Sequence, residues 1–201
     1  MGSMLAEGLW STLDAPPPLH SDAVVVEPAV TADQVLTRLD GRAHGGVKDS
    51  FARMDLSGEG LTLLFTATWF YRKGGQGRKR GESTSWTAVT SPTELAEWTR
   101  RHDTRDVLLP PLLQRAHFRI MAKYVDGQIA AGAVARLGSG TVDVSNVYVM
   151  PGHRLDWAEL AEAIGTYFPC RPLVGYERGA ALRAALEGGF LPTGELRVWV
   201  R

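Results

Sequence analysis

The stretch Thr141–Phe190 constrains the fold more than any other part of this chain, because its hydrophobic periodicity changes from strand to helix and back. Thr141–Met150 is dense in β-branched residues and lies between Gly-rich and Pro-Gly turns, which predicts a strand. Asp156 and Glu159 are spaced as a helix capping box, and apolar residues recur at helical spacing after them. Arg171–Glu177 predicts a second strand, followed by a second helix. Two strands joined by a crossover helix run parallel, and their carboxyl ends are where such folds place ligands.

This block resembles the second half of an N-acyltransferase of the GNAT superfamily. The resemblance is carried by the loop Pro151–Arg154, by the pair Gly189 and Phe190, and by a closing strand, Leu196–Val200. Upstream, Met121–Ala130 is similar to the central hairpin of that family, with an Asp-Gly turn at its tip. The resemblance implies an α+β fold, with a mixed, mostly antiparallel sheet of six to seven strands and helices on both faces.

The length of 201 residues suits one domain with a sizeable core, and a second independent domain is not expected. Residues 1–21 contain three consecutive prolines and little periodicity. We therefore expect a flexible arm over residues 1–21 and a single domain over residues 22–201. The 22 basic and 22 acidic residues give a formal charge of zero, which argues against a general binder of polyanions.

The single cysteine, Cys170, excludes a disulfide framework and a cysteine-based metal cluster. The five histidines are scattered without metal-ligand spacing, so we expect no metal site. No apolar run reaches the length of about 18 residues that a membrane span needs. No segment has the order of basic, apolar and small residues that marks a signal peptide, so we expect a cytoplasmic protein without a membrane partner.

The resemblance also implies where an acyl donor would bind. In the GNAT family the pyrophosphate of the donor lies at the start of the helix after the strand, where backbone N–H groups face the phosphates. Gly152, His153 and Arg154 precede that helix here, and Arg154 matches the basic residue of the family motif. These residues and the backbone N–H groups of Val147 and Val149, which would hold the acyl carbonyl, form the expected donor site. The implied cofactor is acetyl-CoA or another acyl-CoA.

The pyrophosphate motif departs from the family pattern in this chain. Its two glycine positions fall on Trp157 and Glu159. We expect the indole to block the approach of a phosphate to the backbone and the carboxylate to add negative charge. The capping box of Asp156 and Glu159 would also occupy the N–H groups that a phosphate needs. The sequence therefore predicts a degenerate pyrophosphate motif.

Polar side chains on the two predicted strands supply the candidates for catalysis. A carboxylate at Asp143 or Glu177, acting directly or through water, could accept the proton of an amine nucleophile. Under strict alternation, Asp143 and Ser145 share one face of the strand, while Asn146 and Tyr148 share the other. The candidate catalytic residues are Asp143, Ser145, Asn146, Tyr148 and Glu177. A structural role is the alternative for each of them, such as bonding to neighbouring backbone or solvation at a strand end.

The proton donor of the family has no counterpart in this sequence. In many members a tyrosine five positions before the aromatic residue of the Gly-Phe pair protonates the leaving thiolate. That position is Ala185 here, and the asparagine that often begins the same helix corresponds to Arg178. Neither role transfers, which leaves open a catalytically inactive binding module.

A strongly basic loop interrupts the first half of the chain. Arg72–Arg80 has five basic residues in nine, three glycines and no acidic residue. A solvated hairpin tip explains this composition, and so does a flexible arm that contacts the phosphate backbone of RNA. Under the second interpretation the RNA-binding residues are Arg72, Lys73, Arg78, Lys79 and Arg80.

Three functional hypotheses follow, all of them dependent on a resemblance of fold. The first, slightly favoured, is a GNAT-type N-acyltransferase that moves an acetyl or other acyl group from acyl-CoA to an amine. The second takes an aminoacyl group from aminoacyl-tRNA, which needs no pyrophosphate site and would use the basic loop. The third is a non-catalytic module. The expected acceptor is a small-molecule or peptide amine, and a homodimer through sheet edges is a further expectation for this fold class.

Overall fold

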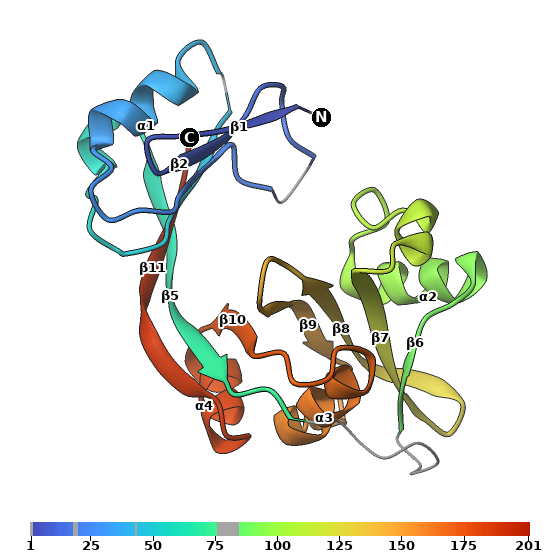
Figure 1. Cartoon of the computed structure of the whole chain (residues 1–201). Coiled ribbons are helices and arrows are strands. Elements are labelled where there is room, and N and C mark those ends of the chain that lie inside the picture. Colours follow the sequence, from blue (N-terminus) through green and yellow to red (C-terminus); the bar gives the residue numbers. More distant parts are fainter. Residues whose placement is uncertain (1, 18–19, 43, 76–84) are drawn as a thin grey trace. The chain divides into compact units, whose positions relative to one another are not determined.

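A computed structural model describes residues 2–17, 20–42, 44–75 and 85–201 of the chain (Figure 1). Within these ranges it contains four α-helices, two short 3-10 helices and eleven strands. The expected α+β class with a mostly antiparallel sheet is confirmed, although the sheet has more strands than the six or seven expected. The chain divides into two compact units, which the sequence did not predict: Met1–Thr68 with Gly194–Arg201, called unit 1, and Trp69–Thr193, called unit 2.

Unit 1 is built from short strands and one helix. Neighbouring strands in the order β1-β2-β3-β4-β11 are antiparallel, except for the parallel pair β3 and β4. Its elements are β1 (Ser3–Ala6), β2 (Leu9–Thr12), β3 (Ala23–Val25), α1 (Ala32–Leu39), β4 (Gly46–Asp49), a 3-10 helix (Ser57–Glu59), and parts of β5 (Thr62–Arg72) and β11 (Leu191–Val200). The segment 1–21, expected to be a flexible arm, contains the hairpin of β1 and β2 instead. Burial of Leu9 in the apolar cluster of the unit fixes this hairpin, and four-residue strands leave too little periodicity to be recognised.

Unit 2 contains the strand–helix–strand block that the sequence singled out. Its strands lie in the order β10-β9-β8-β7-β6; β9 and β10 are parallel, and the other pairs are antiparallel. Its elements are β6 (Trp86–Ala88), α2 (Pro92–His102), a 3-10 helix (Pro110–Gln114), β7 (Phe118–Val125), β8 (Gln128–Leu137), β9 (Val142–Val149), α3 (Trp157–Tyr167), β10 (Leu173–Glu177) and α4 (Gly179–Glu187). The parallel pair joined by a crossover helix agrees with the prediction.

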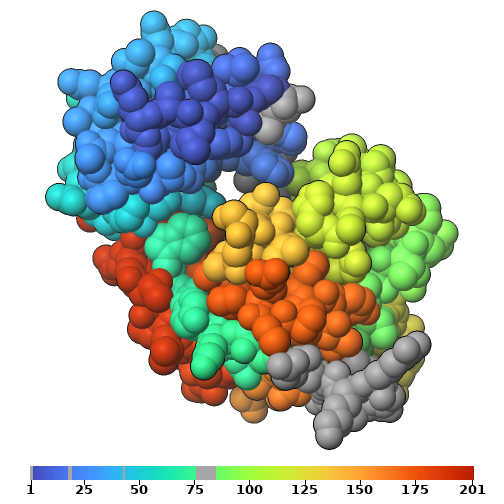
Figure 2. Space-filling model, viewed as in Figure 1, coloured from blue at the N-terminus to red at the C-terminus, as the bar shows by residue number. Residues whose placement is uncertain are grey.

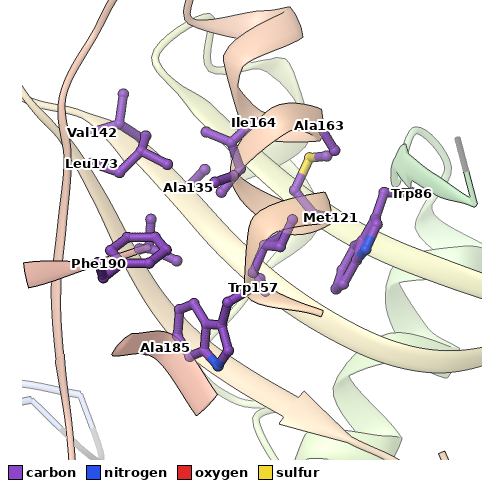
Figure 3. Packing of buried hydrophobic residues seen from close by; sticks show 14 of the residues in the cluster. Trp86, Met121, Ala135, Val142, Trp157, Ala163, Ile164, Leu173, Ala185 and Phe190 are labelled. Atoms are coloured by element: carbon purple, nitrogen blue, oxygen red, sulfur yellow. The ribbon is translucent and has the colours of Figure 1, made fainter. Parts of the chain in front are cut away.

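Helices cover both faces of the unit 2 sheet, as expected. On one face, α3 and α4 supply apolar residues such as Ile164 and Ala185, which pack with Val142 and Val144 of β9 (Figure 3). On the other face, Trp98 of α2 packs with residues of β7 and β8. Because both faces are buried, β8 is apolar along most of its length. The sheet of unit 2 thus has an apolar layer on each face, and Val142 and Val144 of β9 belong to the layer under α3 and α4.

The sequence predicted neither a membrane span nor a metal site, and the described residues can be searched for both. The longest helices there, α2 and α3, have eleven residues each, and no helix is long and apolar enough to cross a membrane. Within the same ranges, no three His, Cys, Asp or Glu side chains lie together as a metal site would require. Cys170 is exposed and is not in a disulfide.

Candidate active site

Strand β9 carries a β-bulge next to Asn146. Gly132 of β8 pairs with Tyr148, and Val134 pairs with Ser145, so that one residue of β8 faces two residues of β9 between these pairs. Asn146 has a φ of +51°, a left-handed conformation in which asparagine is several-fold enriched among non-glycine residues. A bulge of this kind bends the strand and redirects the groups that follow it.

The neighbouring strand β10 separates from β9 just before the bulge. The register between the two strands joins only their first two residues and ends at Asp143 and Val174. The backbones are still in close contact one residue later, since a Cβ on Gly175 would lie 2.5 Å from the carbonyl oxygen of Val144. Both strands then continue without further paired residues in the register. The parallel pair therefore opens toward its carboxyl end, as α/β folds do at ligand sites.

Residues Ser145–Val149, called the open half of β9, are not paired with β10. Some of their backbone N–H groups point to the side of β9 that faces away from β8. The N–H of Met150 donates to the carbonyl of Ala130 on β8, at 2.8 Å. Successive N–H groups of a strand point in opposite directions, so the N–H groups of Val149 and Val147 point away from β8. Two amides two residues apart and directed to the same side are an arrangement that can hold a carbonyl oxygen.

The bulge changes which side chains share a face of β9. Val144 before the bulge and Val147 after it pack in the same apolar cluster, on the side of α3. Tyr148 packs on the side of α2, and Ser145 pairs with a β8 residue whose side chain lies on that side too. Ser145 and Tyr148 thus share a face. Strict alternation predicted opposite faces for these two residues, and that prediction is wrong because the bulge inserts one residue between them.

Tyr148 lies in an aromatic group formed with α2. Its ring is edge-on to Trp98 at a centroid distance of 5.0 Å and tilted against His102 at 5.1 Å. A Cβ on Gly132 would lie 2.3 Å from the Tyr148 ring, so glycine is required there for the packing. The hydroxyl of Tyr148 lies 3.5 Å from the carbonyl oxygen of Trp98, at the long limit of a hydrogen bond. Burial raises the pKa of Tyr148 far above its ordinary value, so its phenol stays protonated at neutral pH.

His102 was not among the residues predicted for the site. Burial lowers the pKa of His102, against the opposing charge of Asp103, so the imidazole is neutral at neutral pH. Its Nδ1 atom is buried and has no hydrogen-bond partner within the described part of the chain. The signal that could have indicated its position is the spacing of four from Trp98, which places both rings on one face of α2.

Glu177 ends β10 on the opposite side of the opening and is half-buried. Burial raises the pKa of Glu177, while the backbone hydrogen bond from Arg178 and the charge of Arg178 act in the opposite direction. A carboxylate with a raised pKa is a stronger base than an exposed one. The pKa of Glu177 is therefore shifted in the direction that favours general-base catalysis.

The remaining catalytic candidates lie at different points along β9. Asp143 is in the paired half, beside Val174 of β10. Ser145 and Asn146 begin the open half, where the amide of Asn146 donates to the hydroxyl of Ser145 at 3.3 Å. The structure thus brings Ser145 and Asn146 together at the bulge, and it places Asp143 before the point where the strands part.

The predicted donor loop is exposed. Gly152, His153 and Arg154 all lie at the surface; Figure 2 shows one face of the molecule in the colours of Figure 1. The N–H of His153 donates to the carbonyl of Met150 at 3.1 Å, which closes a turn directly after β9. Gly152 has a φ of +84°, a conformation that glycine adopts without strain. Arg154 is thus on the surface between β9 and the start of α3.

The start of α3 differs from the predicted capping box. One carboxylate oxygen of Asp156 accepts from the N–H groups of Ala158 and Glu159, at 2.9 and 3.0 Å. The Glu159 carboxylate does not return to the cap; it accepts from Lys123 at 2.6 Å and from the Ser85 hydroxyl at 2.7 Å. Burial alone would raise the pKa of Glu159, but these two hydrogen bonds lower it. The prediction that Asp156 occupies backbone N–H groups is therefore correct, and the reciprocal bond from Glu159 is replaced by an ion pair.

Trp157 points into the core instead of toward a ligand. Its side chain is 1% exposed, and its ring is edge-on to Phe70 and Phe190 at centroid distances of 5.3 and 5.4 Å. Figure 3 shows the indole among the labelled core residues, close to Ala185. The prediction that this indole blocks the approach of a phosphate is therefore wrong, because the apolar burial of a large aromatic ring decides its direction.

The basic loop is described only at its beginning. The guanidinium of Arg72 donates to the carbonyl of Gly188 at 2.8 Å and lies over the ring of Phe190, 5.7 Å from its centroid. Arg72 is thus half-buried in structural contacts, whereas Lys73 is exposed. The other predicted RNA-binding residues, Arg78, Lys79 and Arg80, lie outside the described residues.

A surface groove of about 390 Å³ lies in unit 2, away from the open half of β9. It lies beside β6, the start of β7 and the 3-10 helix Pro110–Gln114. The residues that line it are Thr87–Thr90, Leu112–Ala116, Phe118–Ile120 and Tyr167. None of the predicted catalytic or donor-binding residues is among them. The separation of two strands, and not this groove, is therefore the feature that brings predicted site residues together.

The sequence itself matches no protein-family model and no curated protein. Several solved structures are similar in fold. A GCN5-related N-acetyltransferase from Kribbella flavida superposes with a TM-score of 0.66 at 17% identity, over 99% of this chain and 88% of that one. A putative GNAT acetyltransferase from Novosphingobium aromaticivorans gives a TM-score of 0.62 at 15% identity, over 98% and 89% of the two chains. A conserved protein of unknown function from Staphylococcus epidermidis gives 0.66 at 13% identity, over 100% and 93%.

These likenesses cover nearly the whole chain, so they include both units and not only the stretch that carried the resemblance in sequence. At 13–17% identity they concern the fold alone. The bulged β9, its separation from β10, and the capped helix between them are the local features that accompany this likeness. The chain therefore has the fold of the GNAT acetyltransferases.

Proposed function

We propose that this protein is an N-acyltransferase that moves an acyl group from a thioester donor to an amine on a small molecule or peptide. The observation that carries the proposal is the opening of the β9–β10 pair directly at the bulge. There, strand alternation counted back from Met150, whose N–H donates to β8, directs the N–H groups of Val147 and Val149 toward the side on which β10 no longer pairs. Acetyl-CoA or another acyl-CoA is the first donor to test, because its thioester carbonyl is a group that two such amides can hold.

In this proposal the backbone of β9 polarises the acyl carbonyl. The amine attacks the carbonyl carbon, and the negative charge that develops on its oxygen is stabilised by N–H donors that are already in position. Preorganised donors cost no rearrangement when the charge appears, which is why such sites use backbone amides. Val147 and Val149 contribute through their backbone, so substitution of their side chains is a weak test.

Glu177 is the proposed general base. It accepts the proton that the amine loses as the new C–N bond forms, either directly or through water. The C–S bond then breaks, and the leaving thiolate takes up a proton from water while Glu177 returns its proton to the solvent. Burial raises the pKa of Glu177 and makes its carboxylate a stronger base, which supports this assignment.

Amide NMR shifts test the carbonyl site without knowledge of the acceptor. Acetyl-CoA should shift the amide resonances of Val147 and Val149 strongly, because its carbonyl accepts hydrogen bonds there. S-ethyl-CoA, which lacks the thioester carbonyl, is the matched control and should leave these two resonances closer to their free positions. Equal shifts with both ligands, or none with either, would contradict the carbonyl site.

The general base is tested by release of free thiol in the presence of a panel of primary amines. Glu177→Gln should lower kcat by about 100-fold or more, the usual contribution of a general base. Glu187 on α4 is exposed, so Glu187→Gln removes the same charge and should leave kcat unchanged. Similar rates for both variants would remove Glu177 from the mechanism.

A further inference from the structure

We infer that the donor is recognised through its acyl-pantetheine arm, and that the start of α3 does not bind a pyrophosphate. Pantetheine thioesters without a nucleotide, free or attached to a carrier through one phosphate, are then full donors. The inference rests on the proposed function, since it concerns the same opening between β9 and β10.

The N–H groups that a pyrophosphate would use are already bonded. A single carboxylate oxygen of Asp156 accepts from both Ala158 and Glu159, at 2.9 and 3.0 Å. These are the second and third residues of α3, whose N–H groups have no partner inside the helix and form the anion site of a helix start. Asp156 thus plays the part of the anion, and a phosphate would have to displace a covalently attached carboxylate.

The charges around this helix start also oppose a pyrophosphate. Lys123 is directed to this turn of α3, but its ammonium is paired with Glu159 at 2.6 Å. The second oxygen of Glu159 accepts from Ser85, which holds the carboxylate in place. Arg154 supplies the one full positive charge in residues 151–156, and Asp156 cancels it. A group with two negative charges therefore finds no net positive charge in these residues.

The acyl end of the donor, which would lie at β9, is not affected by these contacts at the start of α3. The bulge and the amides of Val147 and Val149 lie on β9, before the exposed loop that leads to α3. Trp157 is buried, so no side chain at the first position of α3 covers the path. A thioester arm that follows β9 thus meets a formed carbonyl site and then a helix start that is closed by Asp156.

Three donors with increasing phosphate content separate the possibilities: acetyl-pantetheine, acetyl-4′-phosphopantetheine and acetyl-CoA. We expect their dissociation constants, measured by calorimetry, to agree within about threefold, which is under one factor of ten in affinity. A preference of about 100-fold for acetyl-CoA would show that its nucleotide end is bound, and would overturn the inference while leaving the proposed function intact. A gain confined to the single phosphate would point to a carrier-attached arm and supports the inference. If none of the three binds, the proposed function fails, and the inference fails with it.

The variant Asp156→Asn tests directly whether the negative charge of Asp156 weakens the binding of a pyrophosphate at the start of α3. Asparagine is as good a helix cap as aspartate, so α3 should keep its start, and an unchanged melting temperature verifies this. Removal of the charge should strengthen acetyl-CoA binding by about tenfold and leave acetyl-pantetheine unchanged, because a carboxylate no longer repels the phosphates. Glu187→Gln removes one negative charge elsewhere on the same unit and should change neither affinity. An Asp156→Asn variant with the same affinity ratio as the wild type would overturn the inference.

Discussion

The two halves of β9, residues 142–144 and residues 145–149, differ in strand pairing, in backbone conformation and in the polarity of their side chains. Val142 and Val144 in the first half are buried and have β8 on one side and β10 on the other. From Ser145 onward β10 is no longer paired, the backbone contains a left-handed residue, and polar side chains replace the valines at three of five positions. One strand thus changes from a core element to an open edge within one residue.

The difference suggests that substitutions on the two halves will separate stability from activity. The first half contributes buried apolar area and close backbone contacts, so changes there should act on the free energy of unfolding. The second half contributes polar groups and amides that are not paired with β10, so changes there should act on ligand binding and rate.

Gly175→Ala should have the largest effect on stability. A Cβ at this position would lie 2.5 Å from the carbonyl oxygen of Val144 and 2.8 Å from the ring of Phe70. A backbone atom cannot move aside as a side chain can, so we expect a loss of about 3 kcal/mol in the free energy of unfolding, at the upper end for overpacked cores. Urea denaturation measures this loss.

A glycine in the turn before β9 supplies the control. A Cβ on Gly140 would have no heavy atom within 4 Å, and the residue has no left-handed φ. Gly140→Ala should change the free energy of unfolding by less than about 0.5 kcal/mol, the range of most surface substitutions. Equal losses for Gly175→Ala and Gly140→Ala would show that the paired half of β9 is not the rigid part.

Gly132→Ala should cost less, about 2 kcal/mol, because its Cβ would meet side chains and not backbone. The nearest atoms are on the ring of Tyr148, at 2.3 Å, and on the indole of Trp98, at 2.5 Å. Trp98 cannot yield, since its ring N–H donates to the carbonyl of Met121 at 2.9 Å. Tyr148 must therefore move, and the open half of β9 should be perturbed with it.

A double variant tests that explanation. If Tyr148 is the group that yields, Gly132→Ala combined with Tyr148→Ala should destabilise by less than the sum of the two single changes. Strict additivity would mean that the two positions do not share this space, and that the bulge is fixed by other contacts.

The fold of unit 2 was predictable where local signals agree with the tertiary structure. The Asp126-Gly127 turn has positive φ at both residues, as its sequence predicts for a two-residue hairpin. Asp156 caps α3, and β9 and β10 have the predicted parallel arrangement. Each of these features depends on residues that are close together in sequence.

The details of the site depend on contacts that the sequence does not show. An asparagine in a β-branched run gives no sign of a bulge, so the faces after Asn146 could not be assigned. Glu159 has the spacing of a capping box, but an ion pair with Lys123, 36 positions earlier, replaces the local bond. His102 reaches Tyr148 only because α2 packs across the sheet. In each case a long-range contact decides between alternatives that local spacing leaves open.

Asn146 tests the backbone of the open half with a smaller expected effect. Its φ of +51° costs a non-glycine, non-asparagine residue about 1 kcal/mol, so Asn146→Ala should be less stable than Asn146→Gly by that amount. Both variants lose the bond to Ser145, so their difference isolates the backbone conformation. An equal free energy of unfolding for the two variants would mean that the bulge does not require a left-handed residue.

Glu177 should show the smallest effect on stability, with a size that depends on pH. Because burial raises the pKa of Glu177 above that of the unfolded chain, the folded state favours the neutral acid. The associated stability is complete below the unfolded pKa, near 4.5, and is lost as the pH rises through the folded pKa. Glu177→Gln removes the charge that causes this loss.

The melting temperature of Glu177→Gln should therefore exceed that of the wild type at pH 8 and match it near pH 4. We expect a difference of no more than about 2 °C at pH 8, since a half-exposed carboxylate is partly screened and about 1 kcal/mol corresponds to 2–4 °C in a chain of this size. A variant that is more stable at pH 8 but inactive would mean that the open end of the strand pair keeps a destabilising carboxylate for its chemistry. A lower melting temperature at pH 8 would mean that the Glu177 carboxylate stabilises the fold, and the contrast between a structural and a functional half would not extend to β10.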